Sequence, residues 1–313
     1  MVLGQLGADV VKVESPAGDP TRGGQSVPGS DFWYALHRDR RSIVLDLKQP
    51  LDHARLLAMV PQFDIVLDNA RPGVMDRLGL EPAALRAAHP GVISCSISGY
   101  GPGGSDAPAI DGVIQATTGA FDLPVAYGQA SAPLPIQIAD LAGGTAASQA
   151  ILAALYQRTR TGKGTHITIA LTDAVLAWLS IIDRTGTTRS PGTIVATGSD
   201  GRRFLVQAPM HFRVRLATLL GLEYEPTQEY AQQVLDRMAT RPCDEWLAAL
   251  AAEGIPAAEV HTYDEAISGP GTASEVVDGH RVPGSPFVFD GVRRASVAPP
   301  PSLGQHTDAI VGA

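Results

Sequence analysis

The chain has 313 residues, of which 44% are hydrophobic, and it carries a formal net charge of −8. Since single hydrophobic cores seldom grow beyond roughly 250–300 residues, this length favours more than one domain. The acidic balance argues against a general nucleic-acid partner but not against a local basic pocket for a small phosphorylated ligand. Cys95 and Cys243 provide neither a disulfide framework nor a C-x-x-C pair, which favours a cytoplasmic protein. The longest apolar stretch, 174–182, is shorter than the ~20 residues of a membrane-spanning helix.

Short β-branched segments alternate with helical patterns in the N-terminal third of the chain. The strand-like segments are 8–13, 42–47, 64–67 and 92–98, and the helical patterns are 51–60 and 82–88. Strands that are apolar on both faces and separated by helices are typical of a mainly parallel sheet covered on both sides. The sequence therefore predicts an α/β fold.

The clearest helical pattern is Asp140–Thr159, which the Gly-rich segment 161–164 ends. The polar, Gly-, Ser- and Thr-rich segment 184–200 is predicted to be a linker. The remaining predicted elements are a strand (166–171), a helix (173–183), and then, in a small second domain, a strand (204–207), three helices (211–220, 227–238, 244–252) and a strand (257–260).

The segment Gly99–Gly104 matches the pattern G-x-G-x-x-G and follows a predicted strand. In a dinucleotide-binding loop the pattern should open a helix, whereas here Pro102 removes an amide donor and the chain continues as a loop. A loop beside a ligand and an ordinary glycine turn both remain open. The sequence contains no H-E-x-x-H, G-x-S-x-G or Walker motif and no Cys/His cluster with ligand spacing.

The segment Asn69–Gly79 begins where the strand 64–67 ends, which is the edge of an open α/β sheet at which ligands bind. Arg71 and Arg77 are able to form charge-assisted hydrogen bonds with a phosphate there. The alternative is a turn into a short helix whose arginines are simply solvated.

Asp140 stands at the start of the predicted helix 140–159. One interpretation is a helix N-cap, since Asp is favoured there and the helix dipole stabilises its charge. The other is a carboxylate nucleophile, because the small residues 142–145 leave room beside the carboxylate for a bulky group.

Ten segments carry a resemblance to a known group of proteins, and their order and spacing run over nearly the whole chain. They are LGADVVKVE (6–14), GDPTR (18–22), RRSIVLDLK (40–48), NARPGVMDRLG (69–79), ISGYG (97–101), IADL (138–141), TGKG (161–164), DEWL (244–247), GIPAA (254–258) and LGQHT (303–307). Together they resemble the family III coenzyme A transferases, a group that includes formyl-CoA and carnitine CoA transferases and the related α-methylacyl-CoA racemases.

The resemblance implies a Rossmann-like large domain with a mainly parallel sheet, a smaller α+β domain, and two interlocked subunits. We therefore expect a large domain at 1–184, a small domain at 189–280 and a tail, 281–313, that returns to the large domain. The expected assembly is a homodimer, without a nucleic-acid or membrane partner.

The family's catalytic aspartate matches Asp140, which implies an acyl-CoA:carboxylate CoA-transferase that works through an aspartyl-CoA thioester. Coenzyme A, or acyl-CoA, and a small carboxylic acid are then substrates, and no cofactor is bound permanently. The residues that match the family's CoA site are Leu45, Lys48, Asn69, Ala70, Arg77 and Leu78. We expect Lys48 and Arg77 to contact phosphates.

Some positions depart from the family pattern. Ile110 replaces the histidine that precedes the aspartate in the racemases, so a racemase is the second hypothesis, and Ser15, Pro108 and Ile110 differ from the formyl-CoA enzymes. Residues 1–7 resemble the interior of the family's first helix, so we expect the opening strand to be absent and a sheet edge to be exposed. A truncated, catalytically silent CoA-binding or structural subunit is the third hypothesis.

Overall fold

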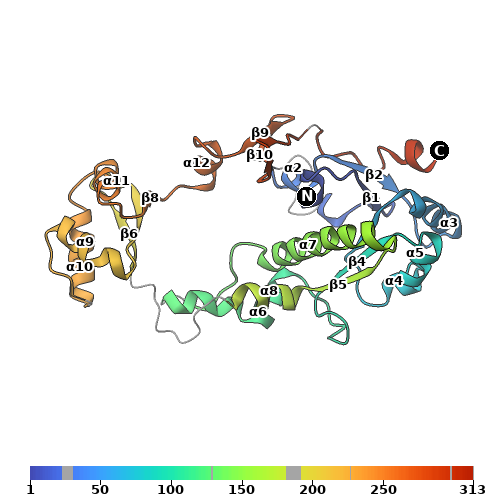
Figure 1. Cartoon of the computed structure of the whole chain (residues 1–313), viewed down its shortest axis with the longest axis horizontal. Helices are drawn as coiled ribbons and strands as arrows, with labels where there is room; N and C mark the ends of the chain where they lie inside the picture. Colours follow the sequence, from blue (N-terminus) through green and yellow to red (C-terminus); the bar gives the residue numbers. More distant parts are fainter. Residues whose placement is uncertain (23–30, 128–129, 181–191, 226, 297, 313) are drawn as a thin grey trace. The chain divides into compact units, whose positions relative to one another are not determined.

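A computed structural model of the chain describes residues 1–22, 31–127, 130–180, 192–225, 227–296 and 298–312. Its internal contacts divide the chain into two units, one made of 1–182 with 271–313 and the other of 183–270. The first unit therefore takes residues from both ends of the chain, which carry the blue and red colours in Figure 1.

The first unit contains two parallel sheets. In one, β1 (Val10–Glu14) pairs with β2 (Arg40–Val44), and in the other the order is β3 (Ile65–Asp68), β4 (Ile93–Ser98) and β5 (His166–Ala170). The predicted α/β fold with parallel strands is thus confirmed. Among the described strands of these two sheets, β1, β2, β3 and β5 are each paired on one side only, as the outer strands of any open sheet are. The expectation that an opening strand is absent stays a prediction.

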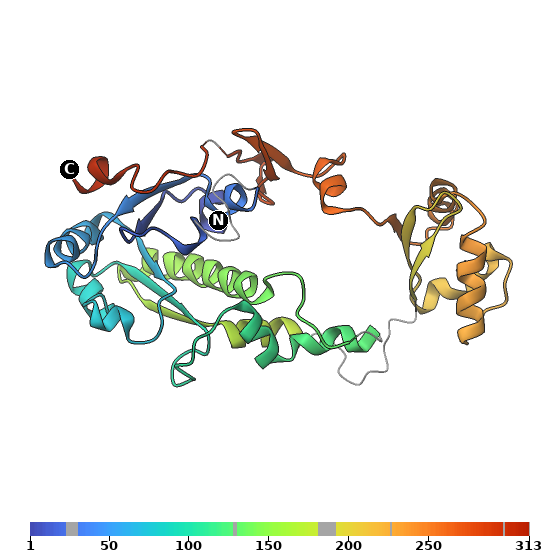
Figure 2. The same cartoon turned by 180° about the vertical axis from the view of Figure 1, so that it is seen from behind.

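Helices connect and cover these strands. They are α1 (Val2–Gln5), α2 (Asp31–His37), α3 (Pro50–Met59), α4 (Val74–Arg77), α5 (Pro82–Ala88), α6 (Asp111–Thr118), α7 (Ile138–Thr161), α8 (Leu171–Leu179) and α13 (Thr307–Val311). The longest, α7, contacts β4, β5, α6 and α8, and it lies along the strands in both Figure 1 and Figure 2. Ala147 and Ile151 of α7 pack with Cys95 of β4 to form a core cluster.

Helix α7 is also, among the described residues, the one helix long and apolar enough to cross a membrane by length and composition. A helix in the core of a globular protein also meets this criterion of length and composition. Here one face of α7 packs into the protein, with Ala142, Ala147 and Ile151 at most 2% exposed. Leu141 and Leu152 of the same helix are 42% and 46% exposed, so this packing accounts for only part of its apolar composition.

The second unit has an antiparallel sheet in the order β6 (Thr193–Thr197), β7 (Arg203–Gln207), β8 (Ala257–Glu259). Its helices are α9 (Met210–Leu220), α10 (Gln228–Met238), α11 (Cys243–Ala252) and α12 (Tyr263–Ser268). The prediction of a linker over 184–200 is wrong for 193–197, because Ala196 is buried in the core of this unit and strand β6 pairs with β7. Residues 184–191 of that prediction lie outside the described residues.

The hairpin of β9 (Ser274–Val277) and β10 (His280–Pro283) belongs to the first unit. It packs on α2, where the Tyr34 hydroxyl donates to Asp278 Oδ2 at 2.7 Å and the Tyr34 ring stacks on His280. The expected end of the small domain at 280 therefore lies beyond the boundary at 270. A second, shorter hairpin, β11 (Val288–Phe289) and β12 (Val292–Arg293), follows.

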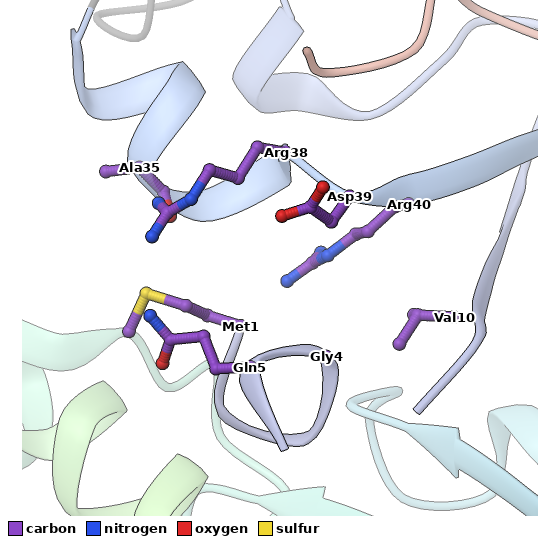
Figure 3. A pocket seen from close by; sticks show the side chains of 8 residues that line it. All are labelled: Met1, Gly4, Gln5, Val10, Ala35, Arg38, Asp39 and Arg40. Atoms are coloured by element: carbon purple, nitrogen blue, oxygen red, sulfur yellow. The ribbon is translucent and has the colours of Figure 1, made fainter. Parts of the chain in front are cut away.

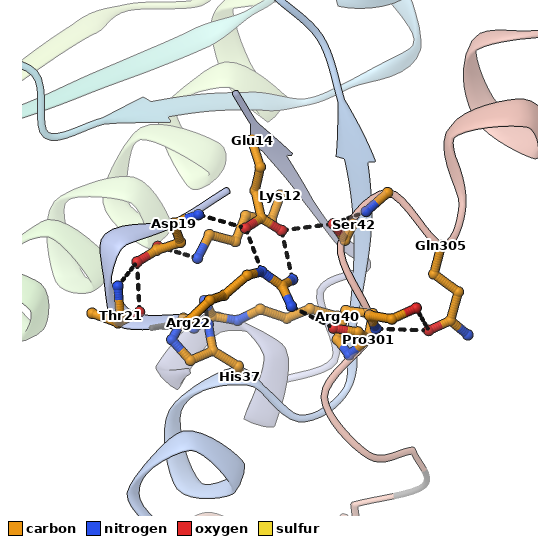
Figure 4. Close-up of polar contacts among 12 residues, drawn as sticks. Lys12, Glu14, Asp19, Thr21, Arg22, His37, Arg40, Ser42, Pro301 and Gln305 are labelled. Carbon is orange, nitrogen blue, oxygen red and sulfur yellow. Dashed lines mark hydrogen bonds and ion pairs between the residues drawn. The ribbon is translucent and has the colours of Figure 1, made fainter. Parts of the chain in front are cut away.

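A polar network attaches the C-terminal segment to β1 and β2 (Figure 4). Arg22 donates from Nε and Nη2 to the carboxylate of Glu14, each at 2.7 Å, and from Nη1 to the carbonyl of Pro301 at 3.1 Å. The Ser42 hydroxyl donates to Glu14 Oε1 at 2.6 Å and accepts from the amide of Gly304 at 3.0 Å. Residues at the two ends of the chain are thereby held together by charged groups.

Candidate active site

The first turn of α7 lies at the carboxyl ends of two parallel strands. Ala139 and Ala142 of this turn are buried in a cluster with Leu171, which follows β5, and they pack against Ile97 near the end of β4. Ligands of open α/β sheets bind along this edge. The fold therefore brings Asp140 to the edge of the sheet at which a substrate is expected.

Asp140 is the third residue of α7, because the helix begins at Ile138 with Gln137 as its N-cap. The N-cap interpretation of Asp140 is thus wrong. Its exposed side chain points away from the buried face, while its neighbour Ala139 is fully buried. An acidic residue in the first turn still interacts favourably with the helix dipole.

Another carboxylate caps the helix instead. Asp111 at the start of α6 accepts at Oδ1 from the amides of Ala139, at 2.7 Å, and Asp140, at 3.4 Å. Gln115, 2% exposed and one turn further along α6, donates to Asp111 Oδ2 at 2.5 Å. Helix α6 therefore supplies the cap that α7 lacks in its own sequence.

The surroundings of Asp140 raise its pKa above the ordinary value. Desolvation is the larger cause, and repulsion by the nearby Asp111 carboxylate is the second. Both effects disfavour the charged form. A carboxylate with a raised pKa is more basic and hence a better nucleophile once it is deprotonated.

The two glycines that follow Asp140 in α7 serve different purposes. A Cβ on Gly143 would lie 2.3 Å from Leu171 Cδ2, so this glycine allows the close packing of α7 on the segment after β5. A Cβ on Gly144 would meet nothing within 4 Å. Residues four apart share a helix face, so the open space at Gly144 lies beside Asp140. Of the two glycines, only Gly144 therefore leaves open space beside Asp140.

Lys48, Arg77 and Leu78 line one open cavity of about 520 Å³. Lys48 follows β2, while Arg77 ends α4 and Leu78 comes directly after it. The remaining lining residues are Leu47, Gln49, Pro50, His53 and Gly79. Two cations beside apolar side chains suit a ligand that carries both phosphates and an apolar or aromatic group.

Three of the sequence-predicted residues do not line this cavity. Leu45 is 2% exposed and packs with Ile43 and Met59, so its side chain belongs to the core. Asn69 and Ala70 follow β3, where the Ala70 amide donates to Asp68 Oδ1 at 3.1 Å. The Asn69 side chain is exposed at this strand end.

The sequence did not identify His53 or Gln115. His53 lies on α3 and lines the cavity, and its Nε2 is buried without a hydrogen-bond partner. Gln115 is a buried polar residue inside a helix. No spacing rule distinguishes such residues from solvated ones, because their burial depends on segments distant in the chain.

The glycine-rich segment after β4 forms turns, and the next helix starts only at Asp111. Gly101 and Gly103 adopt positive φ values of 72° and 74°. The amide of Gly101 takes the Ser98 hydroxyl as its acceptor at 3.2 Å. A dinucleotide loop that opens a helix is therefore excluded for this segment.

A second cavity lies between α1 and the segment that leads into β2 (Figure 3). Arg38, Asp39 and Arg40 line it together with Met1 and Gln5, but its volume is about 10 Å³. Such a volume accommodates about one water molecule. Within the described residues, no group of three or more His, Cys, Asp or Glu side chains is arranged to hold a metal ion.

Comparison with known proteins places the chain in a family. The family described as CoA-transferase family III matches residues 1–202 and 214–307. The acetyl-CoA:oxalate CoA-transferase of Acetobacter aceti is 31% identical over 337 aligned residues, which cover 93% of this chain and 84% of that protein. The formyl-CoA:oxalate CoA-transferase of Bradyrhizobium sp. (strain ORS 278) is 38% identical, but the match covers 56% of this chain and 42% of that protein.

Solved structures agree over the whole fold. Rv3272 from Mycobacterium tuberculosis, in its orthorhombic crystal form, is similar with a TM-score of 0.85 and 27% identity, covering 99% of this chain and 93% of that one. A CAIB/BAIF family protein from Brucella suis has a TM-score of 0.84, 27% identity and the same coverage.

The parallel α/β fold and the matched segments define a protein of the CoA-transferase class. The chain belongs to CoA-transferase family III, whose members use CoA thioesters as substrates, and it is a distant homologue of acyl-CoA:oxalate CoA-transferases.

Proposed function

We propose that this chain transfers coenzyme A from an acyl-CoA to a carboxylic acid, with Asp140 as the nucleophile. The observation that supports this most directly is the exposed Asp140 carboxylate at the sheet edge, with open space at Gly144 one turn away. The raised pKa of Asp140 supports it as well. A thioester carbonyl needs this combination of access and nucleophilicity.

The proposed reaction proceeds through two kinds of covalent intermediate. An Asp140 oxygen attacks the thioester carbonyl, the C–S bond breaks, and CoA thiolate leaves behind a mixed anhydride. The thiolate then attacks Cγ of Asp140, which releases the donor acid and forms aspartyl-CoA. The acceptor carboxylate reverses these steps to give a new acyl-CoA and free Asp140. Each step keeps one partner bound, so two weak anionic reactants never have to meet in solution.

The cavity at Lys48 and Arg77 is the proposed site for the phosphates of coenzyme A. Lys48 follows strand β2, and Arg77 lies on α4, which follows strand β3. Asp140 lies near the ends of β4 and β5. Leu47, which lines the cavity, also packs in one cluster with Val66 of β3, so the loop after β2 is joined to the second sheet. CoA has a long pantetheine arm, and it would run along this edge from a basic mouth to Asp140.

The test is to trap the aspartyl thioester. The protein is incubated with acetyl-CoA, formyl-CoA and longer acyl-CoA donors, with and without hydroxylamine, and peptides are analysed by mass spectrometry. Oxalate is the first acceptor to try, because it is part of the names of the similar transferases. We expect a CoA adduct or hydroxamate at Asp140, lost in Asp140→Ala and Asp140→Asn. Turnover that persists in Asp140→Asn, or an adduct at another residue, would overturn the proposal.

The other two hypotheses give different results in the same experiments. A silent CoA-binding subunit binds CoA but forms no adduct with any donor, and Asp140→Ala leaves its affinity unchanged. A racemase exchanges the α-proton of a branched acyl-CoA with deuterated solvent. Ile110, which is 73% exposed, has no acidic or basic group that could transfer the α-proton, so we expect no exchange.

We further propose a cytoplasmic homodimer as the working form. Size-exclusion chromatography with light scattering tests the assembly by measuring the molar mass of the full chain in solution. A dimer has twice the 32.7 kDa of one chain.

A further inference from the structure

We propose that Gln115 is a positioning residue for the nucleophile: through Asp111 it fixes the start of α7, and with it Asp140, without touching the substrate. This inference rests on the proposed role of Asp140. It starts from a polar side chain within a helix that is 2% exposed and whose Nε2 and Oε1 both form hydrogen bonds.

Gln115 joins the start of its own helix, α6, to the loop that leads into α7. Its Nε2 donates to Asp111 Oδ2 at 2.5 Å and to the carbonyl of Ile136 at 3.0 Å, with the carbonyl of Leu134 more distant at 3.5 Å. Its Oε1 accepts from the amide of Leu134 at 2.9 Å. A primary amide has two N–H donors, and both have a close acceptor here.

These contacts determine the orientation of the amide. Nε2 faces a carboxylate and carbonyl groups, which only accept, and Oε1 faces a backbone N–H, which only donates. A flipped amide would set the acceptor Oε1 against Asp111 Oδ2 and the Ile136 carbonyl, and the donor Nε2 against the Leu134 amide. The Gln115 side chain is therefore locked to the loop that leads into α7 and to Asp111 at the same time.

The Asp111 carboxylate transmits this constraint to Asp140. With Oδ2 held by Gln115, Oδ1 is directed at the amides of Ala139 and Asp140. The same carboxylate is the second cause of the raised pKa of Asp140. A change in the hydrogen bond between Gln115 and Asp111 therefore alters both the backbone position of Asp140 and the electrostatic repulsion of its carboxylate by Asp111.

Gln115→Glu is the sharpest variant because it preserves shape while it replaces the N–H donor by an acceptor. The new carboxyl group would lie against Asp111 Oδ2 and add negative charge within the same cluster. Gln115→Met removes both donors and the acceptor without adding charge. Thr117→Val is the matched control, since the Thr117 hydroxyl on the same helix is exposed and bonds only to Val113 of its own turn.

The experiment follows Asp140 directly and does not require turnover. Protein labelled with ¹³C at aspartate Cγ is titrated by NMR, and the Asp140 resonance is assigned by its loss in Asp140→Asn. We expect Gln115→Glu to move the Asp140 midpoint to higher pH by at least half a unit, and Gln115→Met to broaden or split its resonance. Thr117→Val should match the wild type. An Asp140 midpoint and line width unchanged in a folded Gln115→Glu protein would overturn the inference.

Kinetics and binding give the second readout. In single turnovers with acyl-CoA, Gln115→Glu should slow formation of the Asp140 adduct at least tenfold and shift its acid limb upward. The dissociation constant for CoA should stay within twofold, because the Lys48–Arg77 cavity is unaltered. Equal losses in both quantities would indicate general damage and count against the inference. A wild type that forms no adduct at all refutes the proposed function, while the titration still decides the role of Gln115.

Discussion

Arg22 binds both carboxylate oxygens of Glu14, with two hydrogen bonds of 2.7 Å. Glu14 is 4% exposed, and desolvation alone would raise its pKa, but hydrogen bonds from Arg22 and Ser42 and the charge of Lys12 lower it to about 2. The Arg22 guanidinium also lies over the Trp33 ring, 4.9 Å from its centroid. The ion pair is thus enclosed by β1, β2 and the C-terminal segment, and its loss should affect the whole unit.

Glu14→Gln should lower the free energy of unfolding by about 3–5 kcal/mol at neutral pH, since it leaves Arg22, whose side chain is only 18% exposed, without its charge partner. Urea denaturation measures this value. The control is Asp9→Asn, which breaks an exposed pair with Arg41 and should cost less than about 1 kcal/mol. Similar losses in the two variants would contradict the assignment.

The same carboxylate predicts how stability depends on pH. Its pKa is lowered from 4.5 to about 2 in the folded state, so its contribution is complete above pH 4.5 and disappears as the pH falls toward 2. The shift corresponds to about 3 kcal/mol. Unfolding curves from pH 7 to 2 should show this loss in the wild type and a flatter profile in Glu14→Gln.

Gly144→Ala and Gly143→Ala form a matched pair in the interior of α7. Alanine at 144 meets nothing within 4 Å and should raise stability by roughly 0.5–1 kcal/mol through helix propensity, yet fill space beside Asp140 and reduce adduct formation at least tenfold. Alanine at 143 would meet Leu171 Cδ2 at 2.3 Å and should destabilise by about 1–3 kcal/mol. Melting temperature and hydroxylamine trapping separate the two effects. Full activity in Gly144→Ala would show that the open space is not used.

Lys48→Met and Arg77→Met should each weaken CoA binding by about tenfold or more, through lost charge-assisted hydrogen bonds to phosphate. Calorimetry at two salt concentrations should show a smaller salt dependence in both variants. Arg55→Met is the control, because Arg55 pairs with Asp52 on α3 and does not line the cavity. Weaker binding to the same degree in the control would place the phosphate site elsewhere.

Asp111→Asn removes the charge that helps raise the pKa of Asp140 while it keeps an oxygen for the α7 amides. The acid limb of adduct formation should therefore move to lower pH, opposite to the shift expected for Gln115→Glu. Single-turnover rates between pH 4 and 8 provide the measurement. If the acid limb of the pH–rate profile does not move, desolvation alone raises the pKa of Asp140.

Much of the fold was predictable because it depends on local patterns. The alternation of β-branched runs and helical periods located the five parallel strands and α7 to within a few residues. Strand β6 was missed because its short β-branched run, Thr193–Thr197, lies within a stretch that is otherwise polar and rich in Gly, Ser and Thr. Its strand conformation depends on pairing with β7, which lies across a turn.

The candidate site was predictable only in part. Residue type and position along the chain, together with a family resemblance, identified Asp140, Lys48 and Arg77. The tertiary structure decided that Leu45 is a core residue and that His53 joins the cavity wall. Whether a side chain is buried depends on how distant segments pack around it. The sequence near Leu45 or His53 therefore does not determine the burial of these residues.

By itself, the sequence determined the α/β class, the acidic surface, the helix that carries Asp140 and the two cations of the cavity. Only the tertiary structure decided that Asp111 caps α7 from another helix, that Gln115 holds Asp111, and that Gly143 is packed while Gly144 is open. The physical reason is the same in each case. Hydrogen bonds and van der Waals contacts act over a few ångströms in space, and the partners here are up to 29 residues apart in the chain.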